Sequence, residues 1–314
     1  MTEPASRQVG VLALLRVLLL LAVAFFAWWS LRGHFGDIGR AIGDTSPLGM
    51  LAAVGLTSVG LLLTGFLWLR VLDAYGCRLP LVDGLAIYLV GRLGKYVPGT
   101  VWAIGAQAQL ARRHEVPVRV TVGAALVFVG YNVATAVVAG GLVALAGGVG
   151  VALPWWLVAT GVLVAVAGML PVVANPIGAR FGGAQLRLRL LDAGFLAVGL
   201  VMVWAIYALA LLTITPDPSW RVLVALAGGF TLGYGLGMIV VVAPAGLGAR
   251  EATFIALLAP VTGLAVATSV ALLARVVHLV ADFGVAGATW WLSSRARTAT
   301  GSSQAGLVSA GDEE

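Results

Sequence analysis

The chain has 314 residues, of which 61% are hydrophobic and 10% are charged, a composition that excludes a soluble domain of this length and is typical of a polytopic membrane protein. The formal net charge of +6 does not indicate a nucleic-acid partner here, because arginines between apolar segments follow the positive-inside rule of membrane proteins. The single cysteine, Cys77, excludes an intramolecular disulfide, and no CxxC or HExxH motif suggests a metal. We therefore expect one all-α integral membrane domain over 1–297, without metal or cofactor, and a disordered polar tail over 298–314.

Six apolar segments reach the roughly 20 residues that a spanning helix needs. In chain order they are 10–31, 48–70, 120–146, 152–173, 193–214 and 221–243. The first is longer than the core of a signal peptide and lacks a clear cleavage site, so we expect it to be retained. A seventh segment, 263–292, is also long but contains three ionisable residues. Together these segments predict about seven to eight transmembrane helices.

Two further apolar segments are broken. Segment 82–110 splits at Pro98 and Gly99 into two pieces of about a dozen residues, a length typical of re-entrant or interfacial helices. Segment 244–260 opens with PAGLGARE and continues as a short apolar run. One broken segment in each half of a chain is a pattern of transporters with an internal repeat and a site at the repeat interface. The glycine-rich runs at 140–150 and 228–237, by contrast, predict close helix packing.

The arginines predict the orientation in the membrane. Three groups lie near the ends of the predicted spans, and we place them in the cytoplasm; they are Arg112, Arg113 and Arg119, then Arg180, Arg187 and Arg189, and finally Arg295 and Arg297. Both termini are then cytoplasmic, and segment 82–110 begins and ends on the cytoplasmic side, as a re-entrant hairpin does. By the same parity, segment 244–260 must cross the membrane. We expect a bacterial plasma membrane.

The only lysine, Lys95, lies in the first broken segment, three residues after Arg92. On a helix this spacing presents two cations on one face, which suits an anionic headgroup or a phosphate. A helix that starts after Pro98 and Gly99 would direct free backbone N–H groups to the same place, and Gln107 would extend the polar lining. Alternatively, the two cations extend to lipid phosphates at the cytoplasmic surface, without forming a specific site.

The second broken segment has adjacent opposite charges at Arg250 and Glu251. Glu251 either caps a helix N-terminus or, at membrane depth, pairs with a cation, for which Lys95, Arg92 and Arg275 are the candidates.

The last apolar segment contains Arg275, His278 and Asp282 at a spacing that places them on one helix face. Three ionisable side chains should face the protein interior or water rather than lipid. Either His278 and Asp282 form a proton-relay pair, or all three belong to a static set of ion pairs.

The motifs LGKYVPGTVW and PAGLGARE, in this order, resemble the membrane region of the lysylphosphatidylglycerol synthase and flippase-like family. The resemblance extends over nearly the whole chain, and Ala245 departs from the usual glycine. It implies a bundle of about eight helices with re-entrant segments that moves lipids between leaflets. By motif position, the residues it implies are Lys95, Tyr96, Pro98, Gly99, Pro244, Gly246, Gly248, Arg250 and Glu251. The synthase domain of some members has no counterpart here, so lipid aminoacylation is not expected.

These observations predict a lipid transporter, not an enzyme, that binds an anionic headgroup between its broken segments. The headgroup would contact Arg92, Lys95, Tyr96, Pro98, Gly99, Gln107, Arg250 and Glu251, while Arg275, His278 and Asp282 would act in coupling or ion pairing. One alternative is an enzyme or accessory subunit of cell-envelope glycolipid or polyprenyl-phosphate metabolism, with an envelope-biosynthesis partner protein. The other is a membrane scaffold whose charges only hold helices together.

Overall fold

The computed structural model describes residues 43–97, 101–150, 153–239 and 249–311, together with residues 25, 36 and 40. The predicted helix 10–31 therefore lies outside the described residues, apart from residue 25. The predicted turn residues Pro98, Gly99, Pro244, Gly246 and Gly248 also lie outside them. Throughout the described ranges the regular structure is helical and no strand is present.

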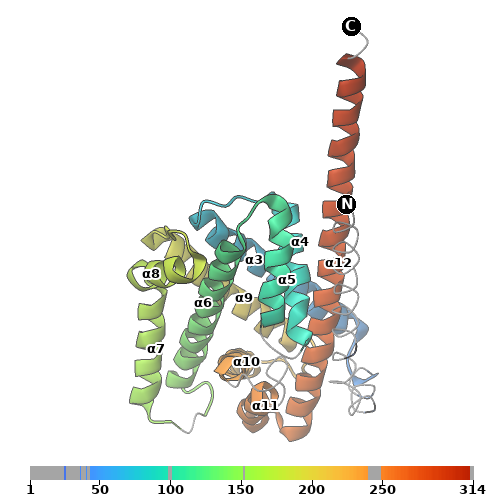
Figure 1. Ribbon diagram of the computed structural model, residues 1–314. Helices are drawn as coiled ribbons and strands as arrows, with labels where there is room; N and C mark the ends of the chain where they lie inside the picture. Colours follow the sequence, from blue (N-terminus) through green and yellow to red (C-terminus); the bar gives the residue numbers. More distant parts are fainter. Residues whose placement is uncertain are drawn as a thin grey trace.

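Five long helices form the body of the molecule (Figure 1). They are α3 (Pro47–Ala74), α6 (Val118–Leu145), α9 (Leu190–Leu212), α10 (Trp220–Ile239) and α12 (Leu264–Gly311). Each contains a stretch long and apolar enough to cross a membrane, and α7 (Trp155–Met169) with α8 (Pro171–Gly182) would make a sixth span. The protein is thus an all-α, multi-pass membrane protein, as the composition predicts.

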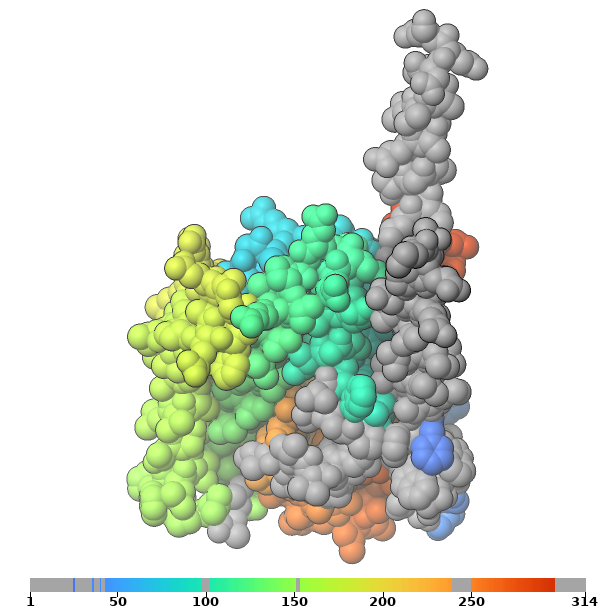
Figure 2. Space-filling model, in the orientation of Figure 1, coloured from blue at the N-terminus to red at the C-terminus, as the bar shows by residue number. Residues whose placement is uncertain are grey.

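Large apolar side chains cover much of the outer surface. On α9, for example, Leu190, Leu191 and Val198 are all exposed, while Leu196 and Leu200 are buried. A helix that is apolar on both its inner and its outer side is typical of a membrane span, where lipid replaces water on the outer side. In the space-filling view, the yellow-green atoms of α7 and α8 form one flank of the displayed face, beside the green atoms of α6 (Figure 2).

The predicted span 152–173 is broken. The chain turns by 62° between α7 and α8, at Leu170, whose backbone is extended. The residue before a proline is disfavoured in the helical region, and Pro171 then starts the new helix. The hydroxyl of Tyr131 donates to the Met169 carbonyl at 2.5 Å, which stabilises the end of α7. The prediction of a span over 152–173 did not include this bend, and α7 and α8 together are long and apolar enough for one broken span.

The arginine-rich connections gather at one end of the bundle, which we call the arginine end. It comprises the connections 75–80, 112–117 and 183–189, together with the part of α12 around Ser293. The Arg187 N–H donates to the Ala74 carbonyl at 3.0 Å, which joins two of these connections. The side chain of Arg119 lies beside Gly183, and Ser293 donates to the Asp83 carboxylate. The clustering agrees with the common side that the positive-inside rule predicts for these arginines.

Glycines allow the helices to approach closely, as the sequence predicts for its two glycine-rich runs. A Cβ at Gly140 of α6 would come within 2.6 Å of Leu232 on α10. A Cβ at Gly233 of α10 would lie 2.8 Å from the Arg250 carbonyl on α11 (Ala249–Thr262). These are helix contacts of the small-residue type found in membranes.

Two segments differ from expectation in length. With 14 residues, α11 is about 21 Å long, shorter than the roughly 30 Å of a membrane core. Residues 244–248 lie outside the described ranges, so the crossing of segment 244–260 stays a prediction. Helix α12 continues to Gly311, into the tail expected to be disordered. Extending an existing helix is much easier than starting one, which accounts for the longer helix. The expected disorder of the tail also stays a prediction.

Candidate functional site

The first broken segment forms a helical hairpin. Helix α4 (Leu81–Arg92) continues as a short 3₁₀ turn, η1 (Leu93–Tyr96), and α5 (Val101–Ala111) returns beside it (Figure 1). Gly91 faces the side chain of Gln107, and a Cβ at Gly94 would lie 2.6 Å from the Ala103 nitrogen. The two arms pack this closely because neither glycine has a side chain.

The hairpin enters from the arginine end and reaches about halfway through the bundle. Asp83, at its start, is level with Ser293 because the two side chains are hydrogen-bonded. At 1.5 Å per residue, Arg92 lies about 14 Å further along α4, and Asp282 lies about 16 Å from Ser293 along α12. Half of a membrane core is about 15 Å. The tip of the hairpin therefore meets α12 near the middle of its apolar part, Leu264–Ala296, as expected for a re-entrant hairpin.

At this depth four side chains form what we call the Asp282 cluster: Arg92, Lys95, Tyr96 and Asp282. The Lys95 ammonium and the Tyr96 hydroxyl both donate to Oδ2 of Asp282, the hydroxyl at 2.7 Å. The Arg92 Nε lies 3.5 Å from Oδ1 in an ion pair. The sequence predicts Arg92, Lys95 and Tyr96 in one group and Asp282 in another, and the fold brings them together.

Two aromatic residues support the cluster. The Arg92 guanidinium donates to the Tyr88 hydroxyl at 3.3 Å, and the Tyr96 ring stacks on Phe283 with ring centres 5.9 Å apart. The sequence reading missed both. Tyr88 lies four residues before Arg92 on the same helix, a spacing that could have revealed it. Phe283 has no comparable signal, because its contact depends on the packing of distant segments.

The cations of the cluster are accessible, whereas its carboxylate is not. The exposed fraction is 27% for the Lys95 side chain and 22% for Arg92, but 2% for Asp282. A ligand would therefore contact the two cations first.

A second ion pair joins α11 to α12. The Arg275 Nε donates to a Glu251 carboxylate oxygen at 3.0 Å, and both side chains are about one-fifth exposed. Arg275 is thus the partner of Glu251 among the three candidates considered. Glu251 also lies in the first turn of α11, so it occupies a capping position at the same time.

Arg250 and His278 lie in an aromatic environment. The Arg250 guanidinium stacks over the Phe230 ring at 4.7 Å, and the His278 ring contacts the rings of Phe230 and Tyr207. His278 Nδ1 lies 2.8 Å from the Ala274 carbonyl, and its Nε2 is buried with no hydrogen-bond partner among the described residues. The predicted relay between His278 and Asp282 is therefore not formed by a direct hydrogen bond within the described part of the chain.

The predicted shared face of α12 does turn inward. Asp282 and His278 are buried, and Arg275 contacts Glu251. Gln107 is also buried, and its Oε1 accepts no hydrogen bond from the residues that the structure describes. Of the residues predicted to contact a headgroup, Pro98 and Gly99 lie outside the described ranges.

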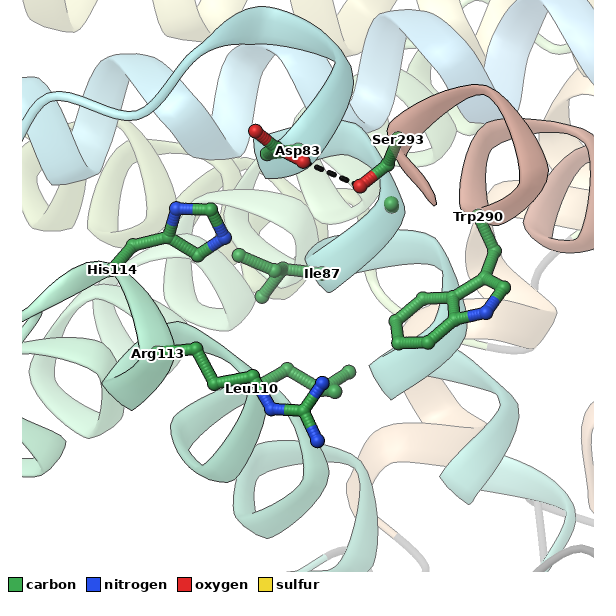
Figure 3. Close-up of a pocket in the computed structure, with 8 residues that line it drawn as sticks. Asp83, Ile87, Leu110, Arg113, His114, Trp290 and Ser293 are labelled. Atoms are coloured by element: carbon green, nitrogen blue, oxygen red, sulfur yellow. Dashed lines mark hydrogen bonds between the residues drawn. The ribbon is translucent and has the colours of Figure 1, made fainter. Parts of the chain in front are cut away.

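A small recess lies at the mouth of the hairpin, at the arginine end (Figure 3). It is shallow and partly open, and is lined by Asp83, Ala86, Ile87, Leu110, Arg113, His114, Trp290 and Ser293. Figure 3 shows Asp83 and Ser293 pointing toward each other, with Arg113 and His114 on the opposite arm of the hairpin. Nearby, the Arg295 guanidinium stacks on Trp291 at 3.8 Å. Tryptophan and arginine together are typical of a membrane–water interface.

Comparison with known proteins does not assign a family. No model of a protein family matches the chain, and no curated protein matches it. The resemblance of the two motifs to the flippase-like family stays a prediction.

Proposed function

We propose that this protein is a flippase-like lipid transporter that binds an anionic phospholipid or lipid-phosphate headgroup at the Asp282 cluster. The observation that carries the proposal is the pairing of two partly accessible cations with one buried carboxylate at the tip of the hairpin. The resemblance of the motifs around Lys95 and Glu251 to the flippase-like family supports the same function.

The charge balance favours an anionic ligand. Arg92, Lys95 and Arg250 contribute three positive charges near the tip of the hairpin, and Asp282 contributes one negative charge. Within the described ranges Arg250 forms no ion pair, and the Glu251–Arg275 pair is neutral as a whole. Unbalanced positive charge inside a membrane is costly, so a site with this excess favours an anion.

In our proposal the headgroup moves along the hairpin between its mouth and its tip. Its mouth lies beside the recess with Arg113 and Trp290, and its tip lies beside the Asp282 cluster. A lipid whose headgroup follows α4 between these points keeps its acyl chains in the membrane. In our proposal the arginine end faces the cytoplasm of a bacterial cell, following the positive-inside rule.

One observation favours the scaffold alternative. The ion pairs of the membrane interior also join separate helices: Asp282 joins α12 to the hairpin, and Glu251 joins α11 to α12. If these pairs only stabilise the fold, Lys95 has no role in lipid movement. The enzyme alternative shares the headgroup site, since a polyprenyl phosphate is also an anionic lipid.

The test is lipid movement in vesicles containing the purified protein. A fluorescent phosphatidylglycerol is placed in both leaflets, and a membrane-impermeant reductant bleaches the molecules that reach the outer leaflet. We expect wild-type protein to bleach nearly all of the probe and Lys95→Ala to leave the inner-leaflet half fluorescent. Arg78→Ala is the control, because Arg78 is exposed and contacts only Asp73 among the described residues.

Unchanged movement with Lys95→Ala would contradict the proposal, provided that the variant has the wild-type melting temperature. Mass spectrometry of the lipids that co-purify from native membranes then identifies the ligand. Enrichment of one anionic lipid in the wild type, and not in the Lys95→Ala, Glu251→Gln variant, supports the site. Bulk lipid in both supports the scaffold.

A further inference from the structure

We infer that Asp282 determines the charge selectivity of the headgroup site. Its carboxylate offsets one cationic charge of the site, which shifts the preference away from a phosphomonoester with two negative charges and toward a phosphodiester with one. This inference deepens the proposed function and rests on it.

The contacts allow a ligand to bind while Asp282 stays in place. An ammonium group has three N–H donors and a guanidinium has five. Asp282 uses one donor of Lys95, and Tyr88 uses one of Arg92. Both cations therefore have donors left for phosphate oxygens. Because Asp282 is 2% exposed and the cations are more than one-fifth exposed, a headgroup adds to the cluster instead of displacing the carboxylate.

The remaining charge sets the preference. Arg92 and Lys95 are positive and Asp282 is negative, which leaves the Asp282 cluster with a net charge of +1. In a membrane interior the ligand that balances the charge of its site is favoured over one that leaves an excess. Arg250, stacked on Phe230, adds one positive charge to the wild type and to every variant below, so the inference concerns the change in preference between variants and not the absolute preference of the wild type.

Glu251 offsets the charge of a different cation. Its carboxylate pairs with Arg275 on α12, at 3.0 Å. Asp282 is the carboxylate that both headgroup-binding cations contact.

The experiment titrates purified full-length protein in detergent with phosphatidylglycerol and phosphatidic acid that have the same acyl chains. Native mass spectrometry gives the ratio of the two dissociation constants. We expect Asp282→Asn to shift the ratio toward phosphatidic acid by about tenfold or more relative to the wild type. Asp217→Asn is the control and should keep the wild-type ratio. Asp217 is exposed and has a positive φ of 50°, a conformation that asparagine tolerates well.

A pair of variants keeps the test valid if Asp282→Asn folds poorly. Lys95→Gln lowers the positive charge of the site by one and should bind both lipids more weakly than the wild type does. Lys95→Gln combined with Asp282→Asn restores the net charge of +1 through Arg92, so binding of phosphatidylglycerol should recover. Equal binding by the single and the double variant would overturn the inference.

The outcomes separate the inference from the function on which it rests. If lipid binding depends on Lys95 but Asp282→Asn keeps the wild-type ratio, Asp282 does not determine selectivity and the proposed function stands. If wild type and Lys95→Gln bind both lipids equally, the anionic headgroup site itself is wrong.

Discussion

At the scale of single residues, each buried charge in the described part of the membrane bundle has a specific partner or an aromatic contact. Asp282 accepts hydrogen bonds from Lys95 and Tyr96, Glu251 accepts one from Arg275, and Arg250 stacks on Phe230. Removing one partner of such a pair leaves the other charge uncompensated, which costs more than the pair contributes as a whole. Single substitutions at these positions therefore test whether a charge is needed for stability or for lipid binding.

Glu251→Gln should lower the free energy of unfolding by about 1–3 kcal/mol, between the values for exposed and for buried ion pairs. The reason is that Arg275 keeps its charge at a site that is only about one-fifth exposed. Thermal unfolding in detergent, followed by intrinsic tryptophan fluorescence, measures the effect. Asp217→Asn is the control and should change stability by less than about 0.5 kcal/mol. A loss as small as that of the control would reduce Glu251 to a helix cap.

At the scale of elements, the hairpin is the part of the fold that positions the site. Its two arms are each too short to span a membrane, and they remain together because glycines allow contact between their backbones. Tyr96 and Lys95 lie in the 3₁₀ turn at the end of α4, where the chain stops being α-helical. The contact between this turn and Asp282 joins the hairpin to α12.

Gly94→Val should separate the two arms. The added side chain would begin 2.6 Å from the backbone of Ala103, which cannot yield without moving α5. Overpacking of this kind typically costs about 1–3 kcal/mol. The melting temperature should fall, and lipid movement in vesicles should fall with it. Gly105→Ala is the matched control on α5, because nothing lies within 4 Å of its Cβ and alanine favours a helix. Equal melting temperatures for the two variants would contradict the close packing of the hairpin.

At the scale of the whole molecule, the two ends of the bundle differ in charge. The connections with arginine lie together at the end from which the hairpin enters. At the opposite end, the end of α9 contacts the start of α3, where the Thr213 hydroxyl donates to the Gly49 carbonyl at 2.9 Å. This asymmetry predicts one orientation in the membrane, with the arginine end in the cytoplasm.

Cys77 tests the orientation, since it is the only cysteine and lies in the connection between α3 and α4. A membrane-impermeant maleimide should label it in inside-out vesicles and not in intact cells. Burial raises the pKa of the Cys77 thiol, so labelling at neutral pH should be slow and should accelerate as the pH rises and thiolate forms. A Cys77→Ser variant gives the background. Labelling from outside intact cells would reverse the predicted orientation.

The sequence alone predicts the elements of this protein well, because membrane spans are recognised by local properties. Composition and the length of apolar runs indicate an all-α membrane protein and place most of the helices, since lipid requires each spanning segment to be apolar and internally hydrogen-bonded. The break of segment 82–110 follows from Pro98 and Gly99, and the shared inward face of Arg275 and Asp282 follows from helical spacing. The bend at Pro171 was equally local, but its signal was overlooked.

The partners of the charges were decided only by the tertiary structure. Lys95 and Asp282 are 187 residues apart, and no periodicity links them. Helical spacing suggested that His278 was the partner of Asp282, whereas the packing of the hairpin against α12 brings Arg92 and Lys95 to that carboxylate and leaves His278 among aromatic rings. Local sequence determines which segments enter a membrane, but a buried charge is stabilised by whichever opposite charge the assembled helices bring within contact distance.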